Sequence, residues 1–274
     1  MEWDPKFLAR SPMFEPLRVH APASFPEAWP DLPMLQELLD RREPPVRVAG
    51  GLLLRIVPQP PRVKRAGLSY EECVFAKGEL QVRPGSWHDL FNVLVWLAFP
   101  RAKAALNARH WAASRERAAS GATNRGRTED ALTLFDEGGV IVAAASAELI
   151  ARLRAFEWKD LFWRRRDEVM KSMRFSLFGH AIYEKALRPF AGITGRGICF
   201  ETDAAFLQAP AAAQLDELDR RLAARISDSG RLTVTRDLAH VPILGVPGWC
   251  HDNEVESYYD NEGYFRPRPE PCDD

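Results

Sequence analysis

Three polar residues interrupt an otherwise apolar segment, and their types and spacing could support acid–base or metal chemistry. Residues 87–99 are expected to form a helix that begins with a capping pattern of Ser86 and Asp89. The segment is apolar nearly all round, which predicts a buried helix. His88, Asp89 and Asn92 are three or four residues apart and therefore share one face. Buried polar groups need partners, so this face either borders a site or, with Asp89 as the cap, braces a neighbouring loop.

The next predicted helix, residues 101–119, also has a polar face. Lys103, Asn107 and His110 follow one another at spacings of four and three. A proline turn separates the two helices, so the two polar faces could oppose each other and His88 could meet His110. The alternative is that Lys103 and His110 face solvent on an alanine-rich helix, and for this helix alone that interpretation is favoured.

A third candidate lies in the predicted helix 180–187, where His180 and Glu184 are one turn apart with Tyr183 beside them. An imidazole and a carboxylate at this spacing can share a metal ion or act as a base and its orienting partner. The pattern is not H-E-x-x-H, and the same spacing suits a hydrogen bond that merely stabilises the helix. Considered in isolation, the pair favours this structural interpretation.

Together these faces predict a polar pocket, and the leading hypothesis is a hydrolase-like enzyme. The pocket residues would be His88, Asp89, Asn92, Asn107, His110, His180 and Glu184. The candidate catalytic residues are His88, Asn92, His110, His180 and Glu184, and the candidate ligands of one divalent metal are His88, His110, His180 and Glu184. Such a metal would activate water; without it, His180 or His88 would act as general base.

The rival hypothesis is a non-catalytic binding or interaction protein that takes a small molecule or a protein. In that case the polar faces are structural, and the aromatic N-terminal and C-terminal segments are the working surfaces. The tail, residues 250–274, is acidic and aromatic but lacks the spacing of a calcium loop. Asp136 and Glu137 are assigned to the turn of a β-hairpin with strands at 132–135 and 140–143, because Gly138 and Gly139 follow them.

Composition excludes several classes of protein. The 274 residues carry a net charge of −1, so the whole molecule has no field that attracts nucleic acid or an anionic membrane. A role with nucleic acid would rest only on Arg125, Arg127 and Arg164–Arg166 and is disfavoured. The start of the chain lacks the basic and apolar regions of a signal peptide, and residues 91–99 are too short to span a bilayer. Scattered cysteines without a C-x-x-C pair fit free thiols, so the sequence predicts a cytosolic protein.

Helical and strand patterns are intermixed, which predicts a single mixed α+β or α/β domain over residues 1–274, with buried central helices and a small sheet. The proline-rich arm, residues 1–35, is expected to be mostly extended. Further helices are expected at 35–42, 146–156, 158–171 and 211–226, and strands at 46–57, 197–201, 232–235 and 241–246.

Several motifs together resemble a known family. They include Trp87-His-Asp-Leu-Phe-Asn92, Phe178-Gly-His-Ala-Ile-Tyr-Glu-Lys-Ala-Leu187 and Leu244-Gly-Val-Pro-Gly-Trp249. From about residue 80 to the end, the chain resembles a proteobacterial family of unknown function, domain of unknown function 3025. The resemblance implies a cytosolic, stand-alone protein, and it carries over no catalytic residue.

Overall fold

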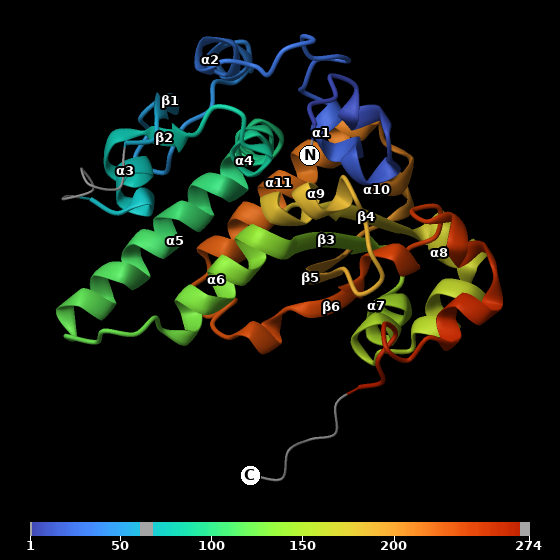
Figure 1. Cartoon of the computed structure of the whole chain (residues 1–274). Coiled ribbons are helices and arrows are strands. Elements are labelled where there is room, and N and C mark those ends of the chain that lie inside the picture. The colour runs from blue at the N-terminus through green and yellow to red at the C-terminus, as the bar shows by residue number, and fades with distance from the viewer. Residues whose placement is uncertain (1, 61–67, 269–274) are drawn as a thin grey trace.

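The computed structural model describes residues 2–60 and 68–268, and a four-stranded mixed sheet lies at its centre (Figure 1). In pairing order the strands are β4 (Met173–Leu177), β3 (Gly139–Ala144), β5 (Thr194–Glu201) and β6 (Ala239–Pro242). Strand β3 runs parallel to β5 and antiparallel to β4, and β6 is antiparallel to β5. Every residue of β3 is buried, as expected of a central strand that is covered on both faces.

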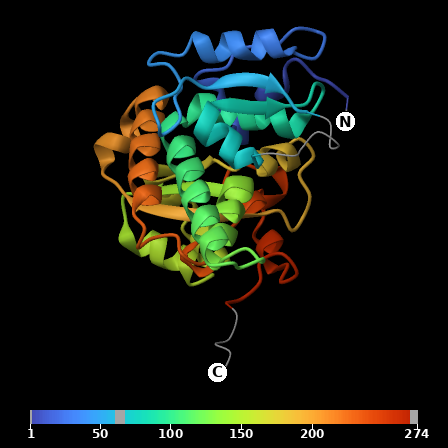
Figure 2. The same ribbon diagram turned by 90° about the vertical axis from the view of Figure 1, so that its left-hand side faces the viewer.

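Five helices pack together beside this sheet, and of these α6 contacts the strands most directly. They are α4 (Trp87–Ala98), α5 (Pro100–Ala119), α6 (Arg127–Gly138), α9 (His180–Ala186) and α11 (Ala211–Ser227). Helix α5 contacts α4, α6 and α11, while α9 contacts α4 and α6. Figure 2 shows α5 running along the front of the molecule, between the N-terminal elements and the loop that leads to α6.

The predicted buried helix is confirmed in α4. The Ser86 hydroxyl accepts a hydrogen bond from the Asp89 N–H at 3.3 Å and caps the helix. Pro100 begins the next helix, so the chain turns at Phe99. Every residue of α4 except His88 is buried. The imidazole of His88, in the first turn, is therefore the side chain of α4 that remains accessible.

A second, smaller unit of structure is formed by N-terminal elements. Strands β1 (Arg55–Pro58) and β2 (Glu79–Val82) pair in parallel beside α2 (Leu32–Asp40) and α3 (Tyr70–Lys77). The remaining elements are short: η1 (Phe7–Ala9), η2 (Pro12–Phe14), α1 (Glu15–Arg18), α7 (Ala147–Arg154), η4 (Asp160–Arg164), α8 (Arg166–Ser172), α10 (Ala204–Gln208), η5 (Thr235–Asp237), η6 (Ile243–Gly245), η7 (His251–Glu254) and η8 (Glu256–Asp260). With helices and two small sheets intermixed, the mixed α+β fold is as predicted.

One hydrophobic cluster includes residues from the arm, the central helices, the sheet and the tail. The arm wraps onto α4 through packed aromatic rings, with the Trp3 ring tilted by 33° against that of Trp87 at 5.1 Å. It is not extended throughout, because η1, η2 and α1 fold within it and bury Phe7 and Phe14. The assignment of residues 1–274 to one domain stays a prediction, and residues 269–274 of the predicted tail lie outside the described residues.

The β-hairpin predicted around residues 136–139 is wrong. Residues 132–135 belong to helix α6, and only the second predicted strand forms, as β3. Ala131, Leu132 and Phe135 are buried along one side of α6, which is helical spacing, and the helix continues to Gly138 before β3 begins in extended conformation at Gly139. The strand predicted at 232–235 is also absent from the described structure; that segment contains bends and the start of η5.

In the part of the chain that the structure describes, the helices fall short of the length and apolar character needed to cross a bilayer.

Candidate metal centre

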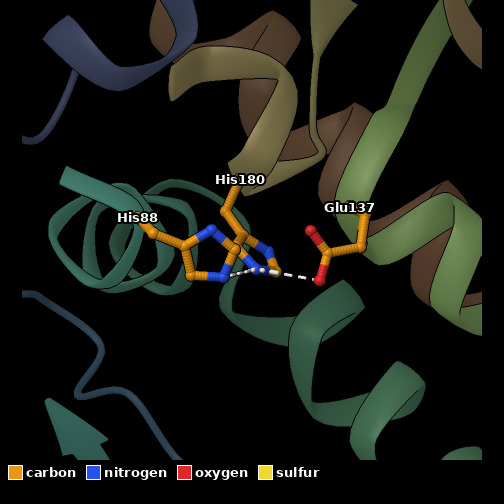
Figure 3. A group of neighbouring side chains, drawn as sticks. All are labelled: His88, Glu137 and His180. Carbon is orange, nitrogen blue, oxygen red and sulfur yellow. Dashed lines mark hydrogen bonds and ion pairs between the residues drawn. The ribbon is translucent and has the colours of Figure 1, made fainter. Parts of the chain in front are cut away.

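Two imidazoles and one carboxylate converge at a junction of three helices (Figure 3). His88 projects from the first turn of α4, His180 is the first residue of α9, and Glu137 lies in the last turn of α6. The Nε2 atoms of His88 and His180 are 3.0 Å apart. The His180 Nε2 atom lies 3.6 Å from Glu137 Oε1. One nitrogen or oxygen from each residue lies within 4.8 Å of the other two, which is the spacing of a shared metal site.

Gly179 permits this convergence. A Cβ atom at this position would lie 2.4 Å from the Glu137 carbonyl oxygen and 2.4 Å from the Gly139 nitrogen. The start of α9 therefore packs directly on the backbone at the end of α6, which any larger residue would prevent. The Gly179 N–H donates to the Gly139 carbonyl at 3.0 Å and holds the junction closed. The contact between backbones places His180 beside Glu137.

Behind His180 lies a buried ion pair. The Lys103 ammonium of α5 contacts Asp136 Oδ1 at 2.5 Å, and the other oxygen of Asp136 is 3.8 Å from His180 Nδ1. Burial raises the pKa of Asp136, but the charge of Lys103, with help from His180, outweighs it and holds that pKa below its usual value. Asp136 is therefore an anion at neutral pH.

The protonation of the two imidazoles follows from their surroundings. Burial lowers the pKa of His180 to about 3, and the Lys103 charge adds to this effect while Asp136 opposes it. His180 is therefore neutral at neutral pH. The Nδ1 atom of His88 lies 3.3 Å from Glu184 Oε2, so each imidazole has a carboxylate beside its Nδ1 atom. Burial raises the pKa of Glu137, against the opposing effect of His88.

A family model described as a protein of unknown function, DUF3025, matches residues 54–269. The chain belongs to the DUF3025 family. No curated protein matches the chain, and no solved structure matches it. All three residues of the convergence lie inside the region that matches the DUF3025 model, whereas the arm before residue 54 lies outside it.

The structure brings two of the four predicted metal ligands into the convergence, His88 and His180. Glu184 does not bond to His180 as its spacing suggested; it reaches His88 on the far side of the ring. His110 is outside the group, and among the described residues no other set of three metal-ligating side chains converges. In this DUF3025 chain the third converging ligand atom comes from Glu137, which the predicted hairpin had placed in a solvated turn.

The other predicted polar residues form a separate cluster next to the convergence. Asn92 donates to the Tyr70 hydroxyl at 2.7 Å, and Asn107 donates to the Glu71 carboxylate at 2.9 Å. A cavity of about 10 Å³, roughly the space of one water molecule, separates this cluster from the ion pair. The side chains of Asn107, His110, Lys103 and Asp136 line it. Lys103 and His110 are both buried and face inward, so the favoured interpretation that they face solvent is wrong.

Asp89 does not take part in the convergence, because its carboxylate is bonded to Arg83. Its carboxylate accepts two hydrogen bonds from the Arg83 guanidinium, both at 2.8 Å, and a third from the Arg83 N–H at 2.7 Å. Burial raises the pKa of Asp89, but these bonds outweigh it and lower that pKa below its usual value. Asp89 therefore fixes the start of α4, next to His88, and is not a ligand candidate.

Asp136, Glu137 and Lys103 are the residues whose positions sequence reasoning missed. The sequence does contain one signal for Asp136 and Glu137, provided that residues 127–138 are taken as a helix. Two adjacent acids in the last turn of a helix face the negative end of its dipole, an unfavourable arrangement unless a cation lies nearby. Lys103 supplies a positive charge for Asp136, and no comparable cation contacts Glu137 among the described residues.

Proposed function

We propose that His88, Glu137 and His180 bind one divalent transition-metal ion and that the protein is a metal-dependent hydrolase. The observation that carries the metal site is the convergence of two imidazole nitrogens and one carboxylate oxygen within 4.8 Å of one another. Two imidazoles and a carboxylate form the ligand set of known catalytic zinc sites and also of non-haem Fe(II) sites, and a hydrolase requires the zinc-like, non-redox role.

The argument for a cation starts from the Nδ1 atoms. A carboxylate only accepts hydrogen bonds, so Asp136 and Glu184 favour a proton on each Nδ1, whereas Glu137, 3.6 Å from the His180 Nε2, favours the other tautomer of His180 when no metal is bound. In the metal-binding tautomers both Nδ1 atoms carry the proton. Each Nε2 atom then presents a lone pair, and the two lone pairs face each other across 3.0 Å. A shared proton could relieve this, but the low pKa of His180 opposes it. A metal ion satisfies both nitrogens and the carboxylate of Glu137.

The spacing supports this interpretation. In a tetrahedral zinc site with bonds of about 2.0–2.1 Å, neighbouring ligand atoms are separated by roughly 3.3–3.4 Å. The observed separations of 3.0 Å between the nitrogens and 3.6 Å to the carboxylate lie on either side of that value. The ligand atoms of the third pair, His88 and Glu137, lie within 4.8 Å of each other, so side-chain movements of at most about 1–2 Å would suffice for binding.

The proposal that the protein is a hydrolase rests on the exposure of the proposed metal ligands to solvent. The side chain of His180 is 5% exposed, but that of His88 is 33% exposed and that of Glu137 is 44% exposed. A metal held by three protein ligands on an accessible side keeps a position open for water, which distinguishes catalytic from structural zinc. A bound metal lowers the pKa of that water and supplies hydroxide near neutral pH.

The first test is metal binding. Purified protein, stripped with a chelator, is titrated with Zn²⁺ and with Co²⁺, whose visible spectrum reports its ligands. We expect one ion per chain, loss of binding in His180→Ala and Glu137→Gln, and unchanged binding in His251→Ala, an exposed histidine far from the convergence in sequence. A wild-type chain that binds neither ion, or a His180→Ala chain that binds as well as wild type, would overturn the metal site.

The second test addresses hydrolysis. The zinc-loaded chain is assayed against panels of carboxylic esters, phosphate esters and peptides, with chelated protein and Glu137→Gln as controls. We expect activity on one class that disappears with chelator and returns with metal. Stoichiometric metal binding without activity on any class would reject the hydrolase and favour the rival, a non-catalytic binding protein.

A further inference from the structure

We infer that Asp136, itself anchored by Lys103, is the residue that positions His180 for metal binding. The inference rests on the proposed metal site and adds two positioning residues to it. It assigns a role to a buried ion pair that neither helix packing nor the ligand set explains.

The ion pair is costly as a purely structural device. The side chain of Lys103 is 5% exposed and that of Asp136 is 17% exposed. Removing two such charges from water costs several kcal/mol, and the attraction between them often only offsets that cost. Apolar side chains at positions 103 and 136 would stabilise the contact between α5 and α6 at least as much. The pair therefore needs a reason beyond stability, and the group in front of it is His180.

The His180 ring supplies that reason. Its Nδ1 atom is buried and makes no hydrogen bond of normal geometry among residues 2–60 and 68–268, although the Asp136 backbone lies close enough to raise the pKa of His180 against the effect of burial. The nearest carboxylate oxygen is Asp136 Oδ2, at 3.8 Å. Metal-bound histidines almost always donate their second ring N–H to a carboxylate or carbonyl, which fixes the tautomer and the ring orientation. A movement of about 1 Å would bring this pair to hydrogen-bond distance.

Lys103 determines which oxygen of Asp136 is available to the histidine. Its ammonium contacts Oδ1, and Oδ2 is the oxygen directed at His180. The ammonium also holds Asp136 as an anion, so that the carboxylate can only accept a hydrogen bond. With Oδ1 held by α5, rotation of the carboxylate away from His180 would break the ion pair.

The local geometry of α6 links positioning to ligation. Asp136 and Glu137 are consecutive residues in the last turn, so one side chain faces the interior and the next faces the accessible side. The first contacts Nδ1 of His180 and the second approaches Nε2 of the same ring. One helix end thereby approaches both nitrogens of His180.

The test compares two ion pairs that join the same helices. Asp136→Asn keeps the shape of the side chain but removes the acceptor-only carboxylate next to His180. The matched control is Glu129→Gln, because Glu129 of α6 is a buried carboxylate that pairs with Arg117 of α5 at 2.9 Å, at the opposite end of α6. We expect the Co²⁺ affinity of Asp136→Asn to fall by about 10–100-fold with an altered Co²⁺ spectrum. The affinity and the spectrum of Glu129→Gln should stay unchanged.

A second variant covers the case in which Asp136→Asn does not fold. The double variant Lys103→Met with Asp136→Asn leaves neither charge buried without a partner, and circular dichroism verifies its fold. We expect it to lose Co²⁺ affinity to the same extent. Wild-type affinity and spectrum in a folded Asp136 variant would overturn the positioning role while the metal site stands; a wild-type chain that binds no Co²⁺ would instead overturn the proposed function.

Discussion

The two ends of helix α6 carry the same kind of interaction in opposite electrostatic settings. At the start, Glu129 pairs with Arg117 and accepts a further hydrogen bond from the Gly126 N–H at 3.0 Å. At the end, Asp136 pairs with Lys103, and its remaining oxygen is directed at His180. A carboxylate in the first turn is favoured by the helix dipole, and one in the last turn is disfavoured.

This difference shows how to separate structural from functional ion pairs. The Glu129 pair satisfies free backbone groups at a helix start, so its presence follows from local structure. The Asp136 pair has no such local reason, and Glu137 beside it adds a second negative charge at the same helix end. The unfavourable end of α6 is where the histidines converge.

The largest effect on stability should come from removing the cation at the C-terminal end of α6, and removing the cation at its start is the comparison. Lys103→Met leaves the Asp136 carboxylate buried with no other donor described for it, and we expect a loss of about 3–5 kcal/mol in the free energy of unfolding. Arg117→Met should cost about 1 kcal/mol, because Glu129 keeps the Gly126 N–H and the favourable dipole. Urea denaturation of metal-free protein measures both; equal losses would remove the electrostatic distinction between the two ends.

The next effect concerns the backbone junction at the end of α6. Gly179→Ala places a methyl group against the Glu137 backbone and should destabilise the protein by about 1–3 kcal/mol. The same change should separate His180 from Glu137 and weaken Zn²⁺ binding. Gly138→Ala is the matched control, since a Cβ there meets no atom within 4 Å. Calorimetric titration with Zn²⁺ and thermal melts report both quantities, and tight zinc binding by Gly179→Ala would contradict the role of the close contact.

A smaller effect is expected in the pH dependence of stability. His180 has a pKa of about 3 in the folded chain and about 6.5 when unfolded, so in this interval the unfolded state binds more protons. The contribution of His180 therefore destabilises the metal-free protein as the pH falls from 6.5 towards 3, by on the order of 1–2 kcal/mol at pH 5. The check is the unfolding free energy of wild type against His180→Gln, in chelator, across this interval. Parallel curves for the two proteins would show that His180 is not held neutral.

The smallest effect should follow from the partner of the other histidine. Glu184 lies beside Nδ1 of His88 but its side chain is 44% exposed, so solvent screens the contact. We expect Glu184→Gln to lower Co²⁺ affinity by less than about tenfold, below the loss in Asp136→Asn. Parallel Co²⁺ titrations of the two variants rank the two carboxylates, and a larger loss in Glu184→Gln would reverse their order.

Periodicity predicted much of the fold because it reports burial directly. The apolar segment that became α4 and the amphipathic segment that became α11 follow from spacing, and β3 was found as an apolar run although it was assigned to a hairpin. The prediction failed at α6, because a run of apolar residues followed by Asp-Glu-Gly-Gly fits a strand and turn as well as a helix and its end. The packing of α6 between α5, α9 and the sheet decides between them.

The sequence by itself named His88 and His180 among five candidate catalytic residues, together with Asn92, His110 and Glu184. His88 interrupts a helix that is apolar nearly all round, and His180 lies one turn before a carboxylate, so residue type and spacing were enough to single them out. Only the tertiary structure decided what joins them, which is Glu137, together with Asp136 and Lys103 behind the ring. These residues are far from the histidines along the chain. Their meeting depends on a helix end that contacts Gly179, and long-range packing of that kind leaves no local pattern in the sequence.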